Sequence, residues 1–300
     1  MVSGSDMHGT PITVTAQQEG KTPEQVAMEY HKLNSDSIER MGISFDLFSH
    51  THTEEHAEVA LSILKKLDEN GYIEPRISEE PYDPIANQFL PDRYVEGTCP
   101  HCNYESARGD QCDDCGKTLD SKELINPRSK LNPDAKVEFR ETEHLFFKLS
   151  EFRDVLLDWL SEGKEHWRSS VINFTRNWLK EGLIDRAVTR DLDWGIEIPR
   201  EGYENKRMYV WFEAVMGYYS ASVHWAKNQG KPEEWKKWWE NEDSEHYYFM
   251  AKDNIPFHTI IWPAMLSGCG YKLPYDVPAN EYLLLDLSLI HISEPTRRLS

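Results

Sequence analysis

The stretch Cys99-Pro-His-Cys102-Asn-Tyr-Glu-Ser-Ala-Arg-Gly-Asp-Gln-Cys112-Asp-Asp-Cys115 carries two pairs of cysteines, each with two residues between its members. Two such pairs close together fold as knuckles that hold one ion tetrahedrally, with Zn–S distances of about 2.3 Å. Gly97, Gly109 and Gly116 supply turn residues around them. The alternative, two disulfides or four unrelated thiols, is disfavoured by the spacing. Four thiolates leave no open position, so we expect a structural ion that does not activate water.

The rest of the composition is typical of a globular protein. The 300 residues are 39% hydrophobic and 12% aromatic, enough for one large domain or two smaller ones. No apolar run approaches the roughly 18 to 20 residues that span a bilayer. The start, Met1-Val-Ser-Gly-Ser-Asp6, lacks the basic and apolar parts of a secretory signal. Only Cys269 lies outside the quartet, which favours a reducing cytoplasm over a disulfide scaffold.

The net charge is −19, from 52 acidic and 33 basic side chains. Such a surface repels nucleic acid unless basic residues gather locally, and it also suits a protein adapted to high salt. Charge alone therefore argues only weakly against a nucleic-acid partner, and that question stays open at this point.

Helix signals occur early in the chain and again past its middle. Thr22-Pro23 with Gln25 predicts a capped helix that runs to about Arg40, and Thr53 predicts another that ends before Gly71. Prolines interrupt short segments from Tyr72 to about Pro127. Two amphipathic helices follow, and the side chains expected on their buried faces are Phe152, Val155, Leu156, Trp159 and Leu160 in the first and Trp167, Val171, Phe174 and Trp178 in the second.

The pattern changes again beyond about Glu197. Met208–Phe212 and Tyr247–Met250 are predicted strands, and Phe257–Leu266 is a predicted helix. Strand–helix units at both ends of the chain predict an α/β fold, in which a Rossmann-type parallel sheet is interrupted by a zinc-binding insertion. The expected parts are residues 1–73 and 208–286 for the sheet domain, 74–207 for the insertion, and 287–300 for a non-native tail.

Ligands of such sheets bind beyond the carboxyl ends of the strands. Three segments lie there, and their notable side chains are Asp6, then Trp211, Ala214 and Tyr218, then Asp253, Asn254, His258 and Trp262. Helical spacing places Trp211, Ala214 and Tyr218 on one face, although aromatic stripes of this kind usually form core. Thioether sulfur gains about 0.3–1.5 kcal/mol against aromatic rings, and a carboxylate such as Asp6 can hold an ammonium group. The combination predicts a site for free methionine.

Several longer segments follow one another in a distinctive order. They are Ser3-Gly-Ser-Asp-Met-His-Gly-Thr-Pro-Ile12, Gly42-Ile-Ser-Phe-Asp46, Phe89-Leu-Pro-Asp-Arg-Tyr-Val-Glu-Gly-Thr-Cys99, Phe139-Arg-Glu-Thr-Glu-His144, Thr189-Arg190-Asp191 with Glu197-Ile-Pro199, Val210-Trp-Phe-Glu-Ala214, and Lys252-Asp-Asn-Ile-Pro-Phe-His-Thr-Ile-Ile-Trp-Pro263. Over approximately residues 1–286 the chain resembles the methionyl-tRNA synthetases, of the archaeal and eukaryotic-like kind.

The resemblance implies a role for each matching residue. Asp6 would bind the amino group of methionine, and Asn254 would border a side-chain pocket formed by Trp211, Ala214, Tyr218, His258 and Trp262. Glu197 and Asp253 would contact the ribose of ATP, and Arg190 its phosphates, so Asp253 and Arg190 are the expected catalytic residues. Cys99, Cys102, Cys112 and Cys115 would hold zinc. Because the stretch near Pro127–Lys130 has no cysteine, one zinc ion is expected.

The implied enzyme is a methionine–tRNA ligase of the cytoplasm with no membrane partner. Its substrates would be L-methionine, ATP with Mg²⁺, and tRNA(Met). The methionine carboxylate would attack the α-phosphate to give methionyl-adenylate, and the tRNA hydroxyl would then take the acyl group. Positioning and electrostatic stabilisation would carry both steps.

Two signatures of the family are expected but not found. A histidine–isoleucine–glycine–histidine turn would precede Met1, and a lysine-rich loop would follow Leu285. In the latter place stands Asp286–Ser300, which resembles a translated sequencing adapter. The expectation is therefore a fragment with little or no turnover by itself.

Two other interpretations remain open from the sequence. Another class I synthetase, for leucine, isoleucine, valine or cysteine, would need a pocket different from the Trp211, Ala214, Tyr218 set. A non-catalytic zinc-binding module would explain the cysteines but neither the strand–helix flanks nor Lys252-Asp253.

Overall fold

The computed structural model describes residues 1–91, 94–109, 112, 114–115, 119–132 and 134–281, so the expected tail at 287–300 lies outside the described residues. The chain divides into two compact units, and each is described by itself. The first comprises Met1–Lys148 and Asp185–Glu234, and the second comprises Leu149–Ile184 with the chain from Trp235 onward. No helix among the described residues is long and apolar enough to cross a membrane.

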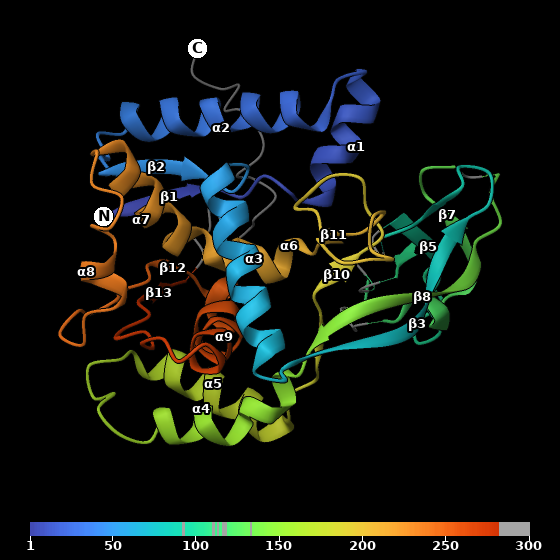
Figure 1. Ribbon diagram of the computed structural model, residues 1–300. Coiled ribbons are helices and arrows are strands. Elements are labelled where there is room, and N and C mark those ends of the chain that lie inside the picture. The colour runs from blue at the N-terminus through green and yellow to red at the C-terminus, as the bar shows by residue number, and fades with distance from the viewer. Residues whose placement is uncertain (92–93, 110–111, 113, 116–118, 133, 282–300) are drawn as a thin grey trace, which may run out of the picture. The chain divides into compact units, whose positions relative to one another are not determined.

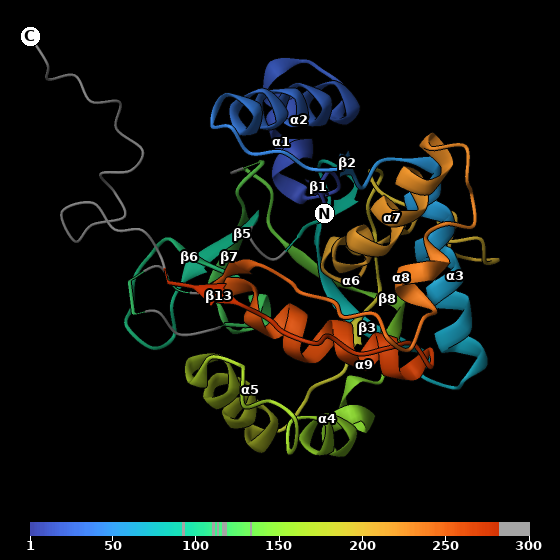
Figure 2. The same cartoon turned by 90° about the vertical axis from the view of Figure 1, so that its left-hand side faces the viewer.

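The first unit begins with two parallel strands. β1 (Val2–Ser5) pairs with β2 (Leu47–His50) in the register Val2↔Leu47 to Ser5↔His50. Their backbones approach closely at Gly4, because a Cβ atom there would lie 2.6 Å from the carbonyl oxygen of Ser49. Helix α7 (Gly217–Asn228) packs against both strands, while α1 (Thr10–Glu19) and α2 (Pro23–Arg40) pack against each other (Figures 1 and 2).

The two predicted early helices are confirmed. Thr22 Oγ1 accepts from the backbone N–H of Gln25 at 3.2 Å, and the Gln25 side chain accepts from the N–H of Thr22 at 2.9 Å, which completes a capping box. Helix α3 (Glu54–Glu69) begins after Thr53, whose hydroxyl accepts from the N–H of His56. Gly71 follows with a φ of 82°, a conformation that favours glycine.

Two antiparallel sheets follow α3 in the first unit. Long strands β3 (Ile73–Asp83) and β8 (Glu138–Phe147) pair from Ile73↔Phe147 to Tyr82↔Glu138, as Figure 1 shows, with β4 (Gln88–Phe89) and β9 (Arg186–Ala187) at the edges. The smaller sheet has the order β6 (Ala107–Arg108), β5 (Val95–Thr98), β7 (Ile125–Ser129). A short 3-10 helix, Ser121–Glu123, precedes β7. Buried Val95, Ala107, Leu124 and Val137 form the core beside the cysteines.

The strand predicted over Met208–Phe212 is wrong except at its first residue. β11 (Arg207–Met208) pairs antiparallel with β10 (Thr189–Arg190), and helix α6 (Val210–Glu213) follows at once, continued by a 3-10 turn, Ala214–Met216. A short apolar run does not distinguish a strand from a buried helical turn. The chain turns at Tyr209, whose carbonyl accepts from the N–H of Phe212 at 2.8 Å.

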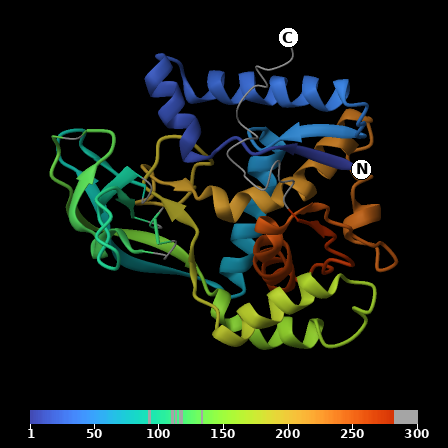
Figure 3. The same cartoon turned by 180° about the vertical axis from the view of Figure 1, so that it is seen from behind.

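The second unit is mostly helical. A 3-10 turn (Leu149–Phe152) leads into α4 (Arg153–Trp159), which packs beside α5 (Ser169–Glu181), as Figure 3 shows from behind. After α8 (Lys236–Trp239), strand β12 (Met250–Ala251) pairs in parallel with β13 (Ala279–Asn280). A 3-10 turn (Lys252–Asn254) and a π-helical turn (Phe257–Ile261) lead into α9 (Trp262–Gly268).

Three predictions for this unit need correction or refinement. The strand expected at Tyr247–Met250 is confirmed only at Met250, since Tyr247 forms a single bridge with Asp276. The expected helix over Phe257–Leu266 is present but starts with the π-helical turn. Val155 and Phe174, expected on buried faces, are 46% and 41% exposed.

The predicted buried face of α5 is confirmed at Val171, and at Trp167 just before the helix, but it continues through Thr175 and Leu179 rather than through Phe174 and Trp178. Thr175 can be buried because its hydroxyl lies 2.8 Å from the carbonyl oxygen of Val171 and 2.9 Å from the Thr259 hydroxyl. A count of apolar residues cannot find a stripe that contains a satisfied polar side chain.

Candidate functional site

A cavity of about 460 Å³ lies in the first unit, beyond the carboxyl end of β1. Three of the predicted site residues, Asp6, Arg190 and Trp211, line it together. They come from the loop after β1, from β10 and from α6. The segment from β3 to β5 contributes further lining residues, which are Glu80, Phe89, Leu90, Pro91 and Tyr94.

Asp6 has a perturbed acidity in this cavity. Burial and the negative charge of Glu213 raise its pKa to about 6, although the backbone N–H of His8, 3.5 Å from Oδ1, acts in the opposite direction. The carboxyl group is therefore mostly ionised at neutral pH, although its side chain is still exposed to solvent. An ionised carboxylate at this place can hold a cationic ligand by charge-assisted hydrogen bonds.

Arg190 is held in place by its neighbours. Its guanidinium carbon lies 4.6 Å from the centre of the Tyr209 ring, and Nη1 donates to the carbonyl oxygen of Thr189 at 3.2 Å. Stacking on an aromatic ring leaves the remaining N–H donors of a guanidinium available for anionic oxygens. The geometry gives this wall of the cavity a fixed positive charge.

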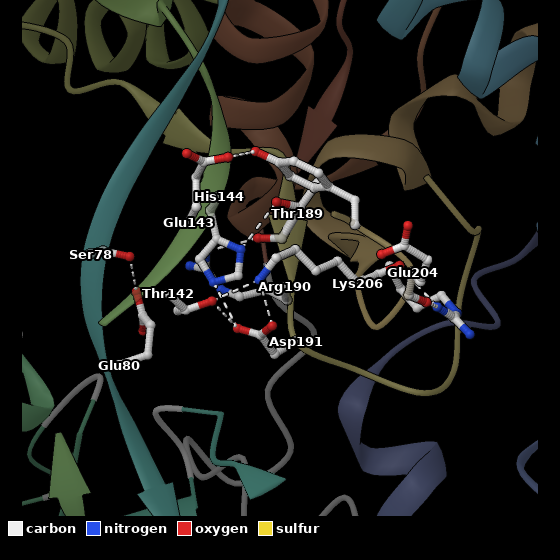
Figure 4. Close-up of polar contacts among 12 residues, drawn as sticks. Ser78, Glu80, Thr142, Glu143, His144, Thr189, Arg190, Asp191, Glu204 and Lys206 are labelled. Carbon is white, nitrogen blue, oxygen red and sulfur yellow. Dashed lines mark hydrogen bonds and ion pairs between the residues drawn. The ribbon is translucent and has the colours of Figure 1, made fainter. Parts of the chain in front are cut away.

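Next to Arg190, Asp191 is the centre of a polar cluster that the sequence analysis did not identify (Figure 4). Lys206 Nζ donates to it at 2.6 Å, the Thr142 hydroxyl donates at 2.9 Å, and His144 Nε2 lies 3.2 Å away. Burial acts to raise the pKa of Asp191, but these contacts outweigh it and the pKa is lowered. The cluster joins β8 to the segment that carries Arg190. Thr142, His144 and Asp191 occur in the quoted segments, but nothing in their spacing indicated this contact.

Three further predicted residues of the first unit are not among those that line the cavity. Ala214 and Tyr218 follow Trp211 along α6, the 3-10 turn and α7, and burial raises the pKa of Tyr218 to about 12. The Glu197 side chain is 82% exposed and pairs with Arg207 at 3.3 Å. The structure therefore brings Asp6, Arg190 and Trp211 together in one cavity but not these three.

The second unit contains Asp253, Asn254, His258 and Trp262. His258 Nδ1 donates to the carbonyl oxygen of Asn254 at 2.9 Å, and burial lowers the pKa of His258 to about 4, so the ring is neutral near pH 7. Asp253 lies on the exposed 3-10 turn.

Tyr248 joins two of these predicted residues and was missed by the sequence analysis. Its hydroxyl accepts from Nε1 of the fully buried Trp262 at 3.0 Å, and its ring centre lies 5.7 Å from that of His258. The only sequence signal for Tyr248 is its place in the aromatic run before β12.

The four clustered cysteines have the geometry of a tetrahedral thiolate site. Their Sγ atoms all lie within 4.8 Å of one another, with Cys99 and Cys115 at 3.9 Å and Cys102 and Cys112 at 3.6 Å. Zn–S bonds of 2.3 Å require S–S separations of about 3.8 Å in a tetrahedron. The backbone N–H of His101 points at Cys99 Sγ from 3.4 Å. All four thiols are free, so the alternative of two disulfides does not describe this fold.

Comparison with known proteins assigns the chain to a family. The family described as "tRNA synthetases class I (M)" matches residues 1–293. Together with the parallel strand pairs and the inserted antiparallel sheets, this match defines a catalytic domain of the class I aminoacyl-tRNA synthetases. Within that class, the chain belongs to the methionyl-tRNA synthetase family.

Two curated relatives share more than half of their aligned residues with the chain. The methionine–tRNA ligase of Dehalococcoides mccartyi is 58% identical over 287 residues, which are 95% of this chain and 51% of the relative. That of Thermomicrobium roseum is 54% identical over 288 residues, which are 95% and 49% of the two chains. The chain thus spans about half the length of the curated relatives it matches.

Solved structures support the fold. Mycobacterium tuberculosis methionyl-tRNA synthetase bound by methionyl-adenylate superimposes with a TM-score of 0.66 over 94% of this chain and 49% of that chain, at 21% identity. A second structure of that enzyme with methionyl-adenylate gives a TM-score of 0.68 over 93% and 48% of the chains, also at 21% identity. At this identity the likeness concerns the fold alone.

Proposed function

We propose that the whole protein is a methionine–tRNA ligase, which activates L-methionine with ATP and transfers the methionyl group to tRNA(Met). The observation that carries this proposal is the shared cavity of Asp6, Arg190 and Trp211, which combines an anion, a cation and a half-exposed aromatic ring. Family membership supports the reaction class. It gives no support to a separate zinc-binding module.

Methionine binding would use the anion and the aromatic side chains. The Asp6 carboxylate would accept charge-assisted hydrogen bonds from the substrate ammonium group. The thioether side chain would contact Trp211, Ala214 and Tyr218 of the first unit. Asn254, His258 and Trp262 of the second unit are further proposed methionine-binding residues. A neutral His258 suits an uncharged thioether, because no charge has to be desolvated when the sulfur approaches.

ATP would bind on the side of the cavity that carries Arg190. Arg190 would hold phosphate oxygens, and Glu197 and Asp253 would hold the ribose, with Mg²⁺ supplied as part of the nucleotide complex. The methionine carboxylate oxygen bonds to the α-phosphorus, and pyrophosphate leaves. The chain would act by placing the two substrates and by balancing the phosphate charge.

The four cysteines would hold one structural Zn²⁺. The sulfur separations fit the ion, and four thiolates fill its coordination. The ion would tie the ends of β5 to the loop after β6. A cytoplasmic location is part of the proposal, because a cysteine quartet spaced for a metal ion and a single further cysteine are typical of a reducing compartment.

The proposal is tested by equilibrium binding of amino acids to the 300-residue chain at pH 8. We expect methionine to bind and leucine to bind at least about tenfold more weakly, since a thioether gains more than a branched alkyl group from aromatic contacts. Asp6→Asn should weaken methionine binding by about tenfold or more, because the ammonium loses its charged partner. Equal binding of leucine and methionine would contradict the proposed specificity.

The pH dependence of this binding provides an internal check. The pKa of Asp6 is about 6, so its ionised form, and with it the affinity for an ammonium group, should be lost as the pH falls below 6. Affinity should drop by about tenfold per pH unit on that acidic limb. Asp6→Asn should remove the limb. An acidic limb that persists in that variant would assign the titration to another group.

A further inference from the structure

A buried chain of polar contacts runs directly behind the candidate cavity. At its centre is Glu213 of α6, which is fully buried. His8 Nδ1 donates to Oε1 of Glu213 at 2.9 Å, and His56 Nε2 donates to Oε2 at 2.6 Å. The chain continues from His8 Nε2 to His52 Nδ1 at 3.1 Å, and from His56 Nδ1 to the Ser220 hydroxyl at 2.8 Å.

A buried, ionised Glu213 does not by itself stabilise the fold. Moving a carboxylate out of water carries a penalty of several kcal/mol that its partners only partly offset, so apolar side chains of similar volume often give an equally stable core. Burial acts to raise the pKa of Glu213, yet the two imidazoles outweigh it and the pKa is lowered. The structure thus holds an ionised carboxylate away from solvent.

The position of Glu213 shows what it connects. It lies two residues after Trp211 on α6, and its partner His8 lies two residues after Asp6, next to Gly9. Asp6, Gly9 and Trp211 all line the cavity, whereas Glu213 does not. The His8–Glu213 contact therefore joins two walls of the cavity from behind. At Met7 the loop is also held by Thr51, whose hydroxyl accepts from the Met7 N–H, and by Trp194, whose Nε1 donates to the Met7 carbonyl oxygen.

We propose that Glu213 is a positioning residue for amino-acid binding, which holds the loop carrying Asp6 against the helix carrying Trp211 by way of His8. The inference rests on the proposed function, in which Asp6 and Trp211 contact methionine. Glu213 itself touches no substrate. It fixes the separation between the ammonium site and the side-chain site, so that a ligand meets both at once.

The same carboxylate also influences the site electrostatically. Its negative charge is the second cause, after burial, of the raised pKa of Asp6, and His8 opposes it. The other ionisable side chains that line the cavity are Glu80 of β3, Tyr94 before β5, His144 of β8, Arg190 of β10, and Asp191 and Tyr209. Replacing Glu213 by glutamine therefore has two separable effects: the loop is held less firmly, and the pKa of Asp6 falls.

The test compares three forms of the 300-residue chain by calorimetric titration with methionine from pH 5 to pH 8.5. We expect Glu213→Gln to bind about tenfold more weakly at pH 8, with its acidic limb displaced to lower pH than in the wild type. The matched control is Glu55→Gln, which removes a carboxylate of α3 that pairs with Lys227 of α7, away from the cavity. It should change neither quantity. Wild-type affinity and an unmoved limb in Glu213→Gln would overturn the proposal.

A second variant separates the two effects. His8→Gln keeps the charge of Glu213 but breaks the imidazole contact, so affinity at pH 8 should fall while the acidic limb does not move to lower pH. If His8→Gln binds methionine as the wild type does, the connection through His8 is refuted.

A measurement without ligand keeps this inference distinct from the proposed function. Hydrogen–deuterium exchange of a peptide over residues 5–12 should be faster in Glu213→Gln than in the wild type and unchanged in Glu55→Gln. Faster exchange with no methionine binding by any form would refute the proposed binding site while supporting the tie between loop and helix. Unchanged exchange in Glu213→Gln would refute the tie even if methionine binds.

Discussion

The guanidinium carbon of Arg190 lies 4.6 Å from the centre of the Tyr209 ring, so the cation on the cavity wall has an aromatic platform beneath it. Stacking of this kind contributes about 0.5–2 kcal/mol and orients the N–H donors. Tyr209→Leu should therefore reduce methionine-dependent pyrophosphate exchange by the full-length protein by about 3- to 30-fold. Tyr209→Phe, which keeps the platform, is the control and should stay near the wild-type rate. Equal losses in both variants would assign the effect to the hydroxyl group.

The cysteine site predicts a defined metal content. The purified chain should contain one zinc ion, and Cys102→Ser should lose it and unfold the small sheet of β5, β6 and β7, because metal binding is coupled to folding in such knuckles. Metal analysis and thermal unfolding measure the two effects. Cys269→Ser, which alters a buried thiol outside the quartet, should retain the zinc. Full zinc occupancy in Cys102→Ser would show that the ion is held elsewhere.

Asp6 should reduce the stability of the free protein at neutral pH. Its pKa rises from 3.8 to about 6 on folding, so the folded state binds the proton more tightly and the ionised form is the destabilised one. By linkage this costs stability above pH 6, and the cost disappears as the pH falls towards 4. Because the Asp6 side chain is exposed and water screens its interactions, Asp6→Asn should raise the free energy of unfolding by under about 1 kcal/mol at pH 8 and by little at pH 4. Urea unfolding at the two pH values measures the difference; a variant less stable than the wild type at pH 8 contradicts the expectation.

Loss of the Tyr248 hydroxyl should lower the free energy of unfolding more than loss of the exposed Tyr247 hydroxyl. Tyr248→Phe leaves the buried Trp262 Nε1 without its acceptor, which costs about 1–3 kcal/mol. Tyr247→Phe removes a hydroxyl that donates to Glu245 on an exposed side chain and should cost under about 0.5 kcal/mol. Chemical denaturation of the two variants makes the comparison. Similar losses would mean that the Trp262 contact is replaced in the variant.

Local signals in the sequence predicted the parts that depend on a few adjacent residues. Thr22 and Gln25 form their capping box, and the paired cysteines converge. The apolar run at Met208–Phe212 predicts a strand, but such a run fits a strand and a buried helical turn equally well, and the chain turns at Tyr209 into α6. The contact of His8 with Glu213 spans 205 residues, and no spacing within the sequence encodes it.

The candidate site also contains residues that the sequence predicts and residues that it does not. Asp6, Arg190 and Trp211 could be proposed from residue type and from resemblance, and they share a cavity. The cluster around Asp191 could not, since Thr142, His144 and Lys206 meet it only after β8 and β10 have come together. Side chains that hold others in place carry no chemical signature of their own.

The close approach at Gly4 limits what evolution or engineering can place there. With Ser49 oxygen 2.6 Å from a Cβ atom, even alanine would force β1 away from β2. Because Asp6 follows just two residues later, that shift would move the carboxylate that we assign to the substrate ammonium. A methyl group that never touches substrate would then alter how tightly an amino acid is held, and an activity screen would score position 4 as if it belonged to the pocket.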